Sequence, residues 1–185
     1  AAELFDLAGA KFVVDGTLRE FFTDDLEPVP GDIGKIVEPG HHLEWVWLLH
    51  KYAELTGDRR AIEMASRLYK FALEYGYDRA SGGVCDQVLS DGRGSRNSRR
   101  LWPQAEALKA HVARCLYAGD VDALTFIDNG IGVLLRDHLD ENAGGWHEHL
   151  DLAGNNFYDS YPASTLYHVA FAVAELDILR NSKGI

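Results

Sequence analysis

The sequence repeats itself at an interval of about 60 residues, and this repeat restricts the fold more than any other feature. An aspartate followed four residues later by Gly-Gly occurs at Asp78 and again 62 residues later at Asp140. Prolines stand before long apolar segments at Pro39, Pro103 and Pro162, at intervals of 64 and 59 residues. Each interval has room for two helices and a long loop. The repeat therefore predicts stacked helical hairpins, each packed against its neighbours.

Apolar residues at helical spacing predict helical segments at residues 1–13, 41–55, 58–75, 101–117, 121–138 and 161–181. Gly57-Asp58 and Gly119-Asp120 separate the members of two pairs, because glycine ends a helix and aspartate caps the next one. The helices that follow the prolines are the more apolar members, so we expect them on the inside and their partners facing solvent. The apolar residues expected inside include Trp47, Leu108, Leu166, Phe171 and Val173.

Two long polar loops, at residues 78–100 and 140–159, are expected to carry short β-hairpins, one of them around residues 84–89. Residues 17–22 are expected to form a short strand or a loop. We therefore expect an all-α fold in which residues 1–185 form a single domain of about three helical hairpins.

The formal net charge of −11 argues against a nucleic-acid partner and against an anionic membrane surface. No apolar run approaches membrane-spanning length, and the first residues lack the pattern of a signal peptide. Cys85 and Cys115 lack the spacing of metal ligands and are interpreted as reduced, packed thiols. We expect a cytoplasmic protein that needs no metal and no cofactor.

Polar side chains recur where the expected inner helices begin. His41 and Glu44 are three residues apart and share one face of the first helix, whereas His42 points about 100° away. The other two inner helices carry polar residues at corresponding places: Trp102, Gln104, Glu106, Ser164, Tyr167 and His168. If the three helices lie side by side, their entrances form one wall of a pocket.

Two histidines in one wall suit proton transfer, because imidazole titrates near neutral pH. A neighbouring carboxylate, Glu44 or Glu106, would orient one imidazole and raise its basicity. Trp102 offers an aromatic face to the apolar side of a sugar ring, and Gln104 can bind hydroxyl groups. These residue types indicate proton abstraction next to a carbonyl group.

The loop before the second inner helix holds four arginines, at positions 93, 96, 99 and 100. The loop is either simply solvated or an anion clamp in which Arg96 and Arg99 bind a phosphate. In the later loop, Trp146-His147-Glu148-His149 resembles a metal-binding tract, but it places two histidines on one side without further clear ligands. We therefore expect no metal site there.

Three segments resemble motifs of the N-acylglucosamine 2-epimerase superfamily. They are Glu38-Pro39-Gly40-His41-His42-Leu43-Glu44-Trp45, the stretch from Arg100 to Ala110 that begins Arg-Leu-Trp-Pro-Gln-Ala-Glu, and Ala163-Ser164-Thr165-Leu166-Tyr167-His168. Members of this superfamily include N-acylglucosamine 2-epimerases, mannose and related aldose-ketose isomerases, and cellobiose 2-epimerases. Their fold is an (α/α)6 toroid, so the resemblance implies that this chain forms about half of such a ring, the C-terminal half.

The resemblance implies that His41 and His168 are the acid-base pair of a reaction through an enediol, and that Glu44 supports the proton transfer. It implies that Trp102 and Glu106 bind a small sugar or sugar phosphate, with Gln104 and Ser164 as further binding candidates. Residues 164–168 look like the mannose or mannose-6-phosphate isomerase branch, and N-acylglucosamine 2-epimerase is the alternative. The family also uses an arginine and a further histidine without counterparts here, so we expect that the N-terminal half of the toroid or a homo-oligomer partner is needed.

Two readings from other classes stay open. Toroidal glycoside hydrolases and polysaccharide lyases use paired carboxylates, and here Glu44 and Glu106, or Asp86, would take those roles. Paired histidines, however, are poor tools for acetal hydrolysis. A non-catalytic helical-repeat binding module would need neither His41 nor His168.

Overall fold

The computed structural model describes residues 1–96, 98–151, 153–158 and 160–184, apart from the side chains of Ser95 and Arg96. In this part of the chain the α-helices are α1 (Ala2–Leu7), α2 (Pro39–Thr56), α3 (Arg59–Phe71), α4 (Leu101–Tyr117), α5 (Ala123–Val133) and α6 (Ala163–Lys183). Turns of π-helix extend α1, α3 and α5, at Ala8–Phe12, Ala72–Gly76 and Leu134–His138, and a 3-10 turn spans Ile33–Lys35. The strands described are all short: β1 (Val13–Val14), β2 (Thr17–Leu18), β3 (Ile36–Val37), β4 (Gln87–Leu89), β5 (Gly94–Arg96), β6 (Arg99–Arg100), β7 (Leu139–Asp140), β8 (Gly145–Trp146) and β9 (His149–Leu150).

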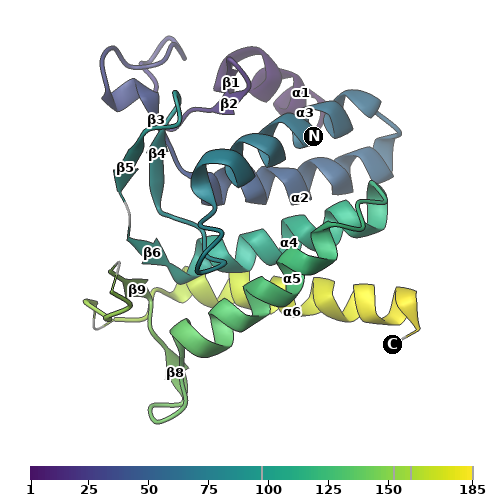
Figure 1. Cartoon of the computed structure of the whole chain (residues 1–185). Coiled ribbons are helices and arrows are strands. Elements are labelled where there is room, and N and C mark those ends of the chain that lie inside the picture. The colour runs from purple at the N-terminus through teal and green to yellow at the C-terminus, as the bar shows by residue number, and fades with distance from the viewer. Residues whose placement is uncertain (97, 152, 159, 185) are drawn as a thin grey trace.

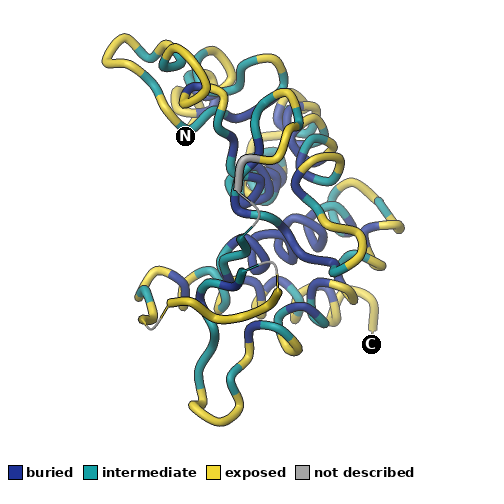
Figure 2. Tube along the Cα trace, turned by 60° about the vertical axis from the view of Figure 1, so that its left-hand side comes forward, coloured by how far each residue is buried: buried dark blue, intermediate teal, exposed yellow. Residues whose placement is uncertain are grey.

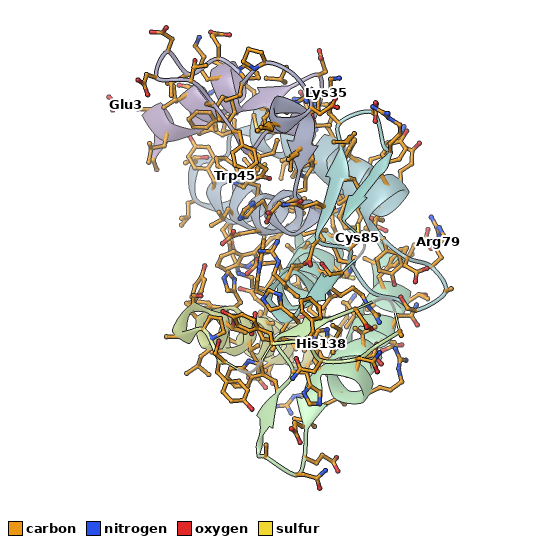
Figure 3. All side chains as sticks on the ribbon, turned by 90° about the vertical axis from the view of Figure 1, so that its left-hand side faces the viewer. Glu3, Lys35, Trp45, Arg79, Cys85 and His138 are labelled. Atoms are coloured by element: carbon orange, nitrogen blue, oxygen red, sulfur yellow. The ribbon has the colours of Figure 1, made fainter. Side chains whose placement is uncertain are left out.

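Helices α2, α4 and α6 form an inner layer in which all three run in the same direction, with α4 in the middle (Figure 1). Helix α3 returns along α2, and α5 returns along α4. The strands and loops gather where the inner helices begin, and Figure 3 looks onto this end of the molecule. The hairpins α2–α3 and α4–α5, each with an inner and an outer member, are thus confirmed.

The helix ends follow the local sequence signals. Pro39 is the first residue of α2, a position where proline costs nothing because the first amide groups of a helix have no partner. Gly57 ends α2 with a left-handed φ of 73°. Asp58 then caps α3 by accepting the Arg60 amide hydrogen at 3.0 Å. The expected helices at 58–75 and 121–138 are shorter as α-helices, because their last turns are π-helical.

The strands pair antiparallel in small sheets. β1 pairs with β2 and β7 with β8, while β4 lies between β3 and β5. The hairpin expected around residues 84–89 is in fact formed by β4 and β5, and Gly92 supplies the left-handed turn between them. β6 pairs with β9, which ties the loop before α4 to the loop before α6.

Helix α4 is the centre of the structure. Thirteen of its seventeen residues are buried. Ala107 and Ala110 pack into the apolar cluster of α2 and α3, whereas Ala105 and Leu108 pack into a second cluster with α5 and α6. Buried residues accordingly concentrate along the inner helices, and exposed ones lie in the loops (Figure 2). Since α4 belongs to both clusters, it fixes the spacing between α2 and α6.

The expectation for α6 was partly wrong. Leu166, Phe171 and Val173 were expected inside, but they are 58%, 45% and 60% exposed. Among the described residues α6 packs mainly on α4 through Val169, Ala172 and Leu176, and no helix covers its other face. None of the described helices combines the length and the apolarity that crossing a membrane requires.

A glycine allows the close approach of α2 to the start of α4. A Cβ atom on Gly40 would lie 2.7 Å from the Trp102 ring and 2.9 Å from Pro103. We expect Gly40→Ala to lower the free energy of unfolding by about 1–3 kcal/mol through overpacking. Gly132→Ala is the matched control, because a Cβ there meets nothing within 4 Å, and it should raise stability by roughly 0.5–1 kcal/mol. Urea denaturation measures both, and equal effects of the two variants would contradict the packing.

Candidate active site

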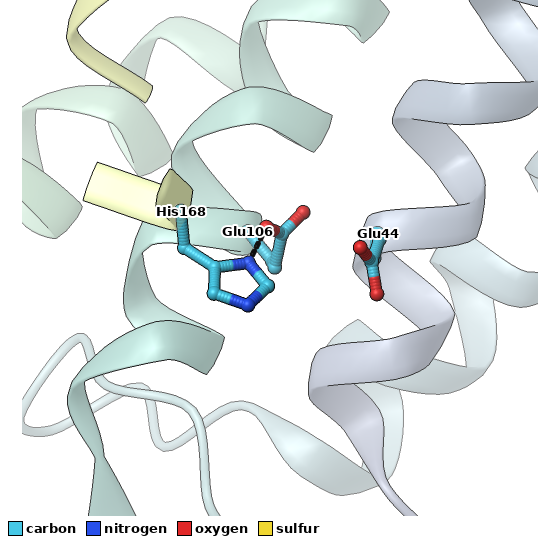
Figure 4. A group of neighbouring side chains, drawn as sticks. All are labelled: Glu44, Glu106 and His168. Atoms are coloured by element: carbon cyan, nitrogen blue, oxygen red, sulfur yellow. Dashed lines mark hydrogen bonds and ion pairs between the residues drawn. The ribbon is translucent and has the colours of Figure 1, made fainter. Parts of the chain in front are cut away.

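The inner helices bring the predicted polar residues to one place. His41 and Glu44 come from α2, Trp102 and Glu106 from α4, and His168 from α6. Figure 4 shows Glu44, Glu106 and His168 facing one another from the three helices. One ligand atom of each lies within 4.8 Å of the others. The parallel inner helices thus place together residues that are up to 127 positions apart in the chain.

His168 is held by a buried carboxylate. Its Nδ1 is in hydrogen-bond contact with Oε1 of Glu106, which is fully buried. An ionised carboxylate only accepts hydrogen bonds, so Nδ1 carries the hydrogen and Nε2 is left to exchange a proton. Lys109 Nζ lies 2.8 Å from the same Glu106 oxygen, and Lys109 is also fully buried. Lys109 lies within a run of apolar residues, and no sequence pattern marks it as part of a site.

His41 has a different carboxylate partner from the one expected. Its Nδ1 lies 2.9 Å from Oε2 of Glu20, in the loop after β2, and Oε1 of Glu20 accepts the amide hydrogen of Glu38 at 3.0 Å. Burial by itself lowers the pKa of His41, but the hydrogen bond with Glu20 and the charges of Glu20, Glu38 and Glu44 outweigh it, and the pKa is raised. Glu44 instead accepts the hydroxyl hydrogen of Tyr167 at 3.3 Å.

Trp102 contacts both imidazole rings. Its ring centroid lies 4.9 Å from that of His41 and 5.4 Å from that of His168. The guanidinium group of Arg100 lies over the same indole, 5.2 Å from a ring centroid. The two histidines therefore share one aromatic neighbour. On the His41 side a hollow of about 330 Å³ opens, lined by Glu20, Trp45 and other aromatic side chains.

Among the described side chains, the arginine loop reaches the site through Arg100 and not through Arg99, one of the two predicted phosphate ligands. Arg100 forms ion pairs with Glu38 at 2.8 Å and Asp86 at 2.9 Å beside Trp102. Arg99 points the other way, to Asp137 at 3.3 Å, because successive residues of a strand face opposite sides. The side chain of Arg96 lies outside the described residues. Phosphate binding by Arg96 and Arg99 stays a prediction, and for Arg99 it would require leaving Asp137.

The remaining predicted residues have other surroundings. Gln104 donates to the carbonyl oxygens of Val84 and Arg100 and accepts the Val84 amide hydrogen at 2.7 Å, so its polar atoms anchor a loop. Ser164 is exposed in the first turn of α6. His42 is fully buried and accepts the Leu18 amide hydrogen at 3.1 Å. Burial lowers its pKa to about 3, which suits a neutral structural histidine.

In the tract at residues 146–149, the acidic side chain is engaged in hydrogen bonds within the protein. Glu148 is buried, and its carboxylate accepts hydrogen bonds from Trp146 Nε1 at 3.2 Å and from the side chain of Thr165. Burial raises the pKa of Glu148. Because Thr165 lies in the first turn of α6, Glu148 secures the start of the helix that carries His168.

Glu44, Glu106 and His168 are also the one group of described residues close enough to share a cation. In the structure, Oε1 of Glu106 is already engaged by His168 and by the ammonium group of Lys109. A bound cation would therefore compete with Lys109 for the same oxygen. The donor set does not fit a resident metal, and the expectation of a metal-free reaction stays a prediction.

A sequence model of the family N-acylglucosamine 2-epimerase (GlcNAc 2-epimerase) matches residues 1–172. Mannose-6-phosphate isomerase of Rhizobium meliloti (strain 1021) is 34% identical over 182 residues, which cover 96% of this chain and 47% of that protein. N-acylglucosamine 2-epimerase of Mus musculus is 26% identical over 140 residues, which cover 73% of this chain and 33% of that protein. The chain thus spans half or less of the length of these curated relatives.

Two solved structures share the arrangement of helices. Cellobiose 2-epimerase from Spirochaeta thermophila DSM 6192 superimposes with a TM-score of 0.80 at 19% identity, covering 96% of this chain and 46% of that one. A D-mannose isomerase superimposes with a TM-score of 0.80 at 21% identity, covering 88% of this chain and 45% of that one. At these identities the likeness concerns the fold alone. The fold is thus about half of an (α/α)6 toroid, as the resemblance to the family implied.

The Glu20 and His41 pair predicts a pH-dependent stability. Because the pKa of folded His41 is raised above 6.5, the pair stabilises the fold fully below that pH, and the contribution fades as the pH rises through the folded pKa. Glu20→Gln should therefore cost more stability near pH 5.5 than near pH 9 in urea denaturation. Glu27→Gln is the control, since its exposed ion pair with Lys11 should show no such pH dependence. A loss that is equal at both pH values would argue against the pair.

Proposed function

Because the chain belongs to the N-acylglucosamine 2-epimerase family, we propose that it supplies the acid-base residues of a sugar isomerase. The observation that carries this proposal is the shared geometry of two histidines. Each has a carboxylate at Nδ1, Glu20 for His41 and Glu106 for His168, and both rings contact Trp102. Two oriented imidazoles on one wall suit a reaction that takes a proton from carbon and returns it elsewhere.

In the proposed reaction one imidazole Nε2 removes the proton from C2 of the open-chain sugar, and the electron pair moves toward the carbonyl oxygen. The C1 oxygen takes up a proton, which gives the enediol. A proton then adds at C1 while the 2-hydroxyl group loses its proton, so that the carbonyl group forms at C2 and the aldose becomes a ketose. Return of the proton to C2 from the opposite face would instead invert C2. Glu20 and Glu106 stabilise the imidazolium that forms in each half of the cycle. Trp102 would hold the apolar face of the sugar, and Glu44 with Tyr167 would bind hydroxyl groups.

We propose mannose or mannose 6-phosphate as the substrate, with N-acylglucosamine 2-epimerisation as the alternative. The isomerase relative is the more similar of the two curated proteins, at 34% against 26% identity. Arg100 of the arginine loop lies over Trp102, the residue that contacts both histidines, but it is already paired with Glu38 and Asp86. A phosphate group would therefore depend on Arg96, on Arg99 or on residues of the other half of the ring.

The proposed site also needs a second wall. Tyr167 is 43% exposed beside His168, and the neighbouring apolar residues of α6 are exposed as well. This exposure supports the proposal that the N-terminal half of a toroid, or a homo-oligomer partner, completes the pocket. We place the reaction in the cytoplasm, where the free thiols Cys85 and Cys115 would stay reduced.

The hydrolase alternative has less support from the contacts. A glycosidase needs one carboxyl group that donates a proton to the leaving oxygen. Glu106 is buried and engaged by His168 and Lys109, so it is poorly placed for that role. Asp86 is buried and paired with Arg100, and Glu44 alone would not supply both functions.

The function is tested on the complete protein that contains this chain. Incubation with mannose, mannose 6-phosphate and N-acetylmannosamine, followed by NMR in deuterated water, distinguishes ketose formation from inversion at C2. We expect a ketose from mannose or its phosphate, with deuterium incorporated at carbon and with turnover unchanged by EDTA. Inversion of N-acetylmannosamine alone would favour the epimerase, and release of reducing sugar from an oligosaccharide alone would favour the hydrolase.

The two histidines are tested one at a time. His41→Ala and His168→Ala should each lower kcat by about 100-fold or more, because general acid-base catalysis contributes that much. Circular dichroism checks that each variant is folded. His147→Ala is the control, since the structure shows its backbone oxygen accepting a hydrogen bond from His138 and places it in a loop. Full activity of both test variants would show that neither histidine takes part in the proton transfer, and would overturn the proposed mechanism.

A further inference from the structure

Lys109 is a charged residue in a place that favours an apolar one. It is the largest of the described side chains that are less than 2% exposed. Its Nζ lies 4.0 Å from the centroid of the Trp47 ring and 5.4 Å and 5.9 Å from those of Tyr167 and Phe171. Burying an ammonium group costs several kcal/mol, as an order of magnitude, unless it is paired. The partner is Glu106, and Glu106 Oε1 is also the atom that holds His168.

We propose that Lys109 is a positioning residue of the active site, which shares Glu106 Oε1 with His168 and so keeps the imidazole in its proton-accepting form. Lys109 is fully buried and cannot reach a substrate. It acts through Glu106. The proposal rests on the proposed function, because it gives His168 a part in the proton transfer.

The need for a cation follows from the two carboxylates that face each other. Glu44 and Glu106 lie within the 4.8 Å cluster, and like charges at that distance favour protonation of one carboxylate. Glu106 is the more buried of the two, so water screens its charge less and it depends more on a neighbouring cation. An ammonium group 2.8 Å from Oε1 offsets that tendency and keeps Glu106 an acceptor. Glu106 then holds the hydrogen on Nδ1 of His168 and leaves Nε2 free.

Without the ammonium group, two other states become available. A protonated Glu106 can donate to Nδ1, which moves the imidazole hydrogen to Nε2. An ionised Glu106 without its cation instead favours the imidazolium form of His168. In both states Nε2 is occupied by a hydrogen. Either state removes the base that the proposed reaction requires.

Other charged and titratable groups surround His168, but they do not contact Glu106 Oε1. Glu44 and His41 face it from α2, the latter across Trp102. Arg100 lies over Trp102 from β6, Glu148 interacts from the β8–β9 loop, and Tyr167 precedes it on α6. Within the described residues, His168 is hydrogen-bonded to Glu106 Oε1, Lys109 forms an ion pair with the same atom but no hydrogen bond, and Oε2 has no partner. Lys109 is thus the cation that controls this carboxylate.

The test is Lys109→Met in the complete protein, with histidine labelled by ¹⁵N and the His168 signals assigned by their loss in His168→Gln. In wild type we expect His168 with one bare nitrogen, Nε2. In Lys109→Met we expect Nε2 protonated at the same pH, and a fall in kcat of at least about tenfold with little change in KM. Unchanged His168 signals in a folded Lys109→Met variant would overturn the proposal.

Lys51→Met is the matched control. Like Lys109, Lys51 pairs with a glutamate and lies near an aromatic ring: its Nζ is 3.1 Å from Glu175 of α6 and 5.1 Å from the centroid of the Tyr117 ring. It contacts neither Glu106 nor His168. It should lower stability without changing the His168 signals or kcat. A change of the His168 signals in Lys51→Met equal to that in Lys109→Met would mean that any lost ion pair has this effect, and would overturn the proposal.

A double variant decides the case in which Lys109→Met does not fold. Glu106→Gln/Lys109→Met removes both buried charges and leaves an amide oxygen that can accept from Nδ1. We expect it to fold and to restore the form of His168 with a bare Nε2, whereas a protonated Nε2 in the double variant would overturn the proposal. If wild type converts none of the sugars, the proposed function fails, and the NMR comparison still shows whether Lys109 controls His168.

Discussion

The structure depends on the burial of α4 between two apolar clusters. One face of this helix carries Ala107 and Ala110 toward α2 and α3, and the other carries Ala105 and Leu108 toward α5 and α6. The same burial takes Glu106 and Lys109 out of water. A buried charge is costly unless it is paired, so the burial of α4 requires Glu106 and Lys109 to form an ion pair at the site. His168 then joins that pair from α6.

The two histidines reach similar hydrogen-bond patterns by different structural routes. His168 and Glu106 lie on neighbouring helices in a buried setting, whereas His41 is partly exposed and depends on Glu20 from an irregular loop. Trp102 joins the two settings because it contacts both rings. In the proposed reaction this difference suits different roles for the two histidines, one as proton donor and one as proton acceptor. His41, whose pKa is raised, holds a proton readily, and His168 is held with its reactive nitrogen free.

Helix positions and the hairpin order could be predicted because periodicity, proline and glycine are local signals. The ends of α3 and α5 were harder to predict, since a single turn is too short for the apolar spacing to distinguish a π-helical turn from an α-helical one. The exposure of Leu166, Phe171 and Val173 was not predictable from their apolar character. Whether such a face is covered depends on which other helices pack there.

The sequence by itself determined the hairpin repeat, the inner helices and the clustering of His41, Glu44, Trp102, Glu106 and His168 at their starts. Helical spacing and chain direction act within one repeat, so they can be read locally. Only the tertiary structure decided the partners. Glu20 joins His41 across 21 residues and Glu106 joins His168 across 62, and the strand pairing of β6 with β9 turns Arg100 rather than Arg99 toward Trp102. Such contacts depend on how loops and helices from distant repeats pack, and no pattern within a single repeat specifies them.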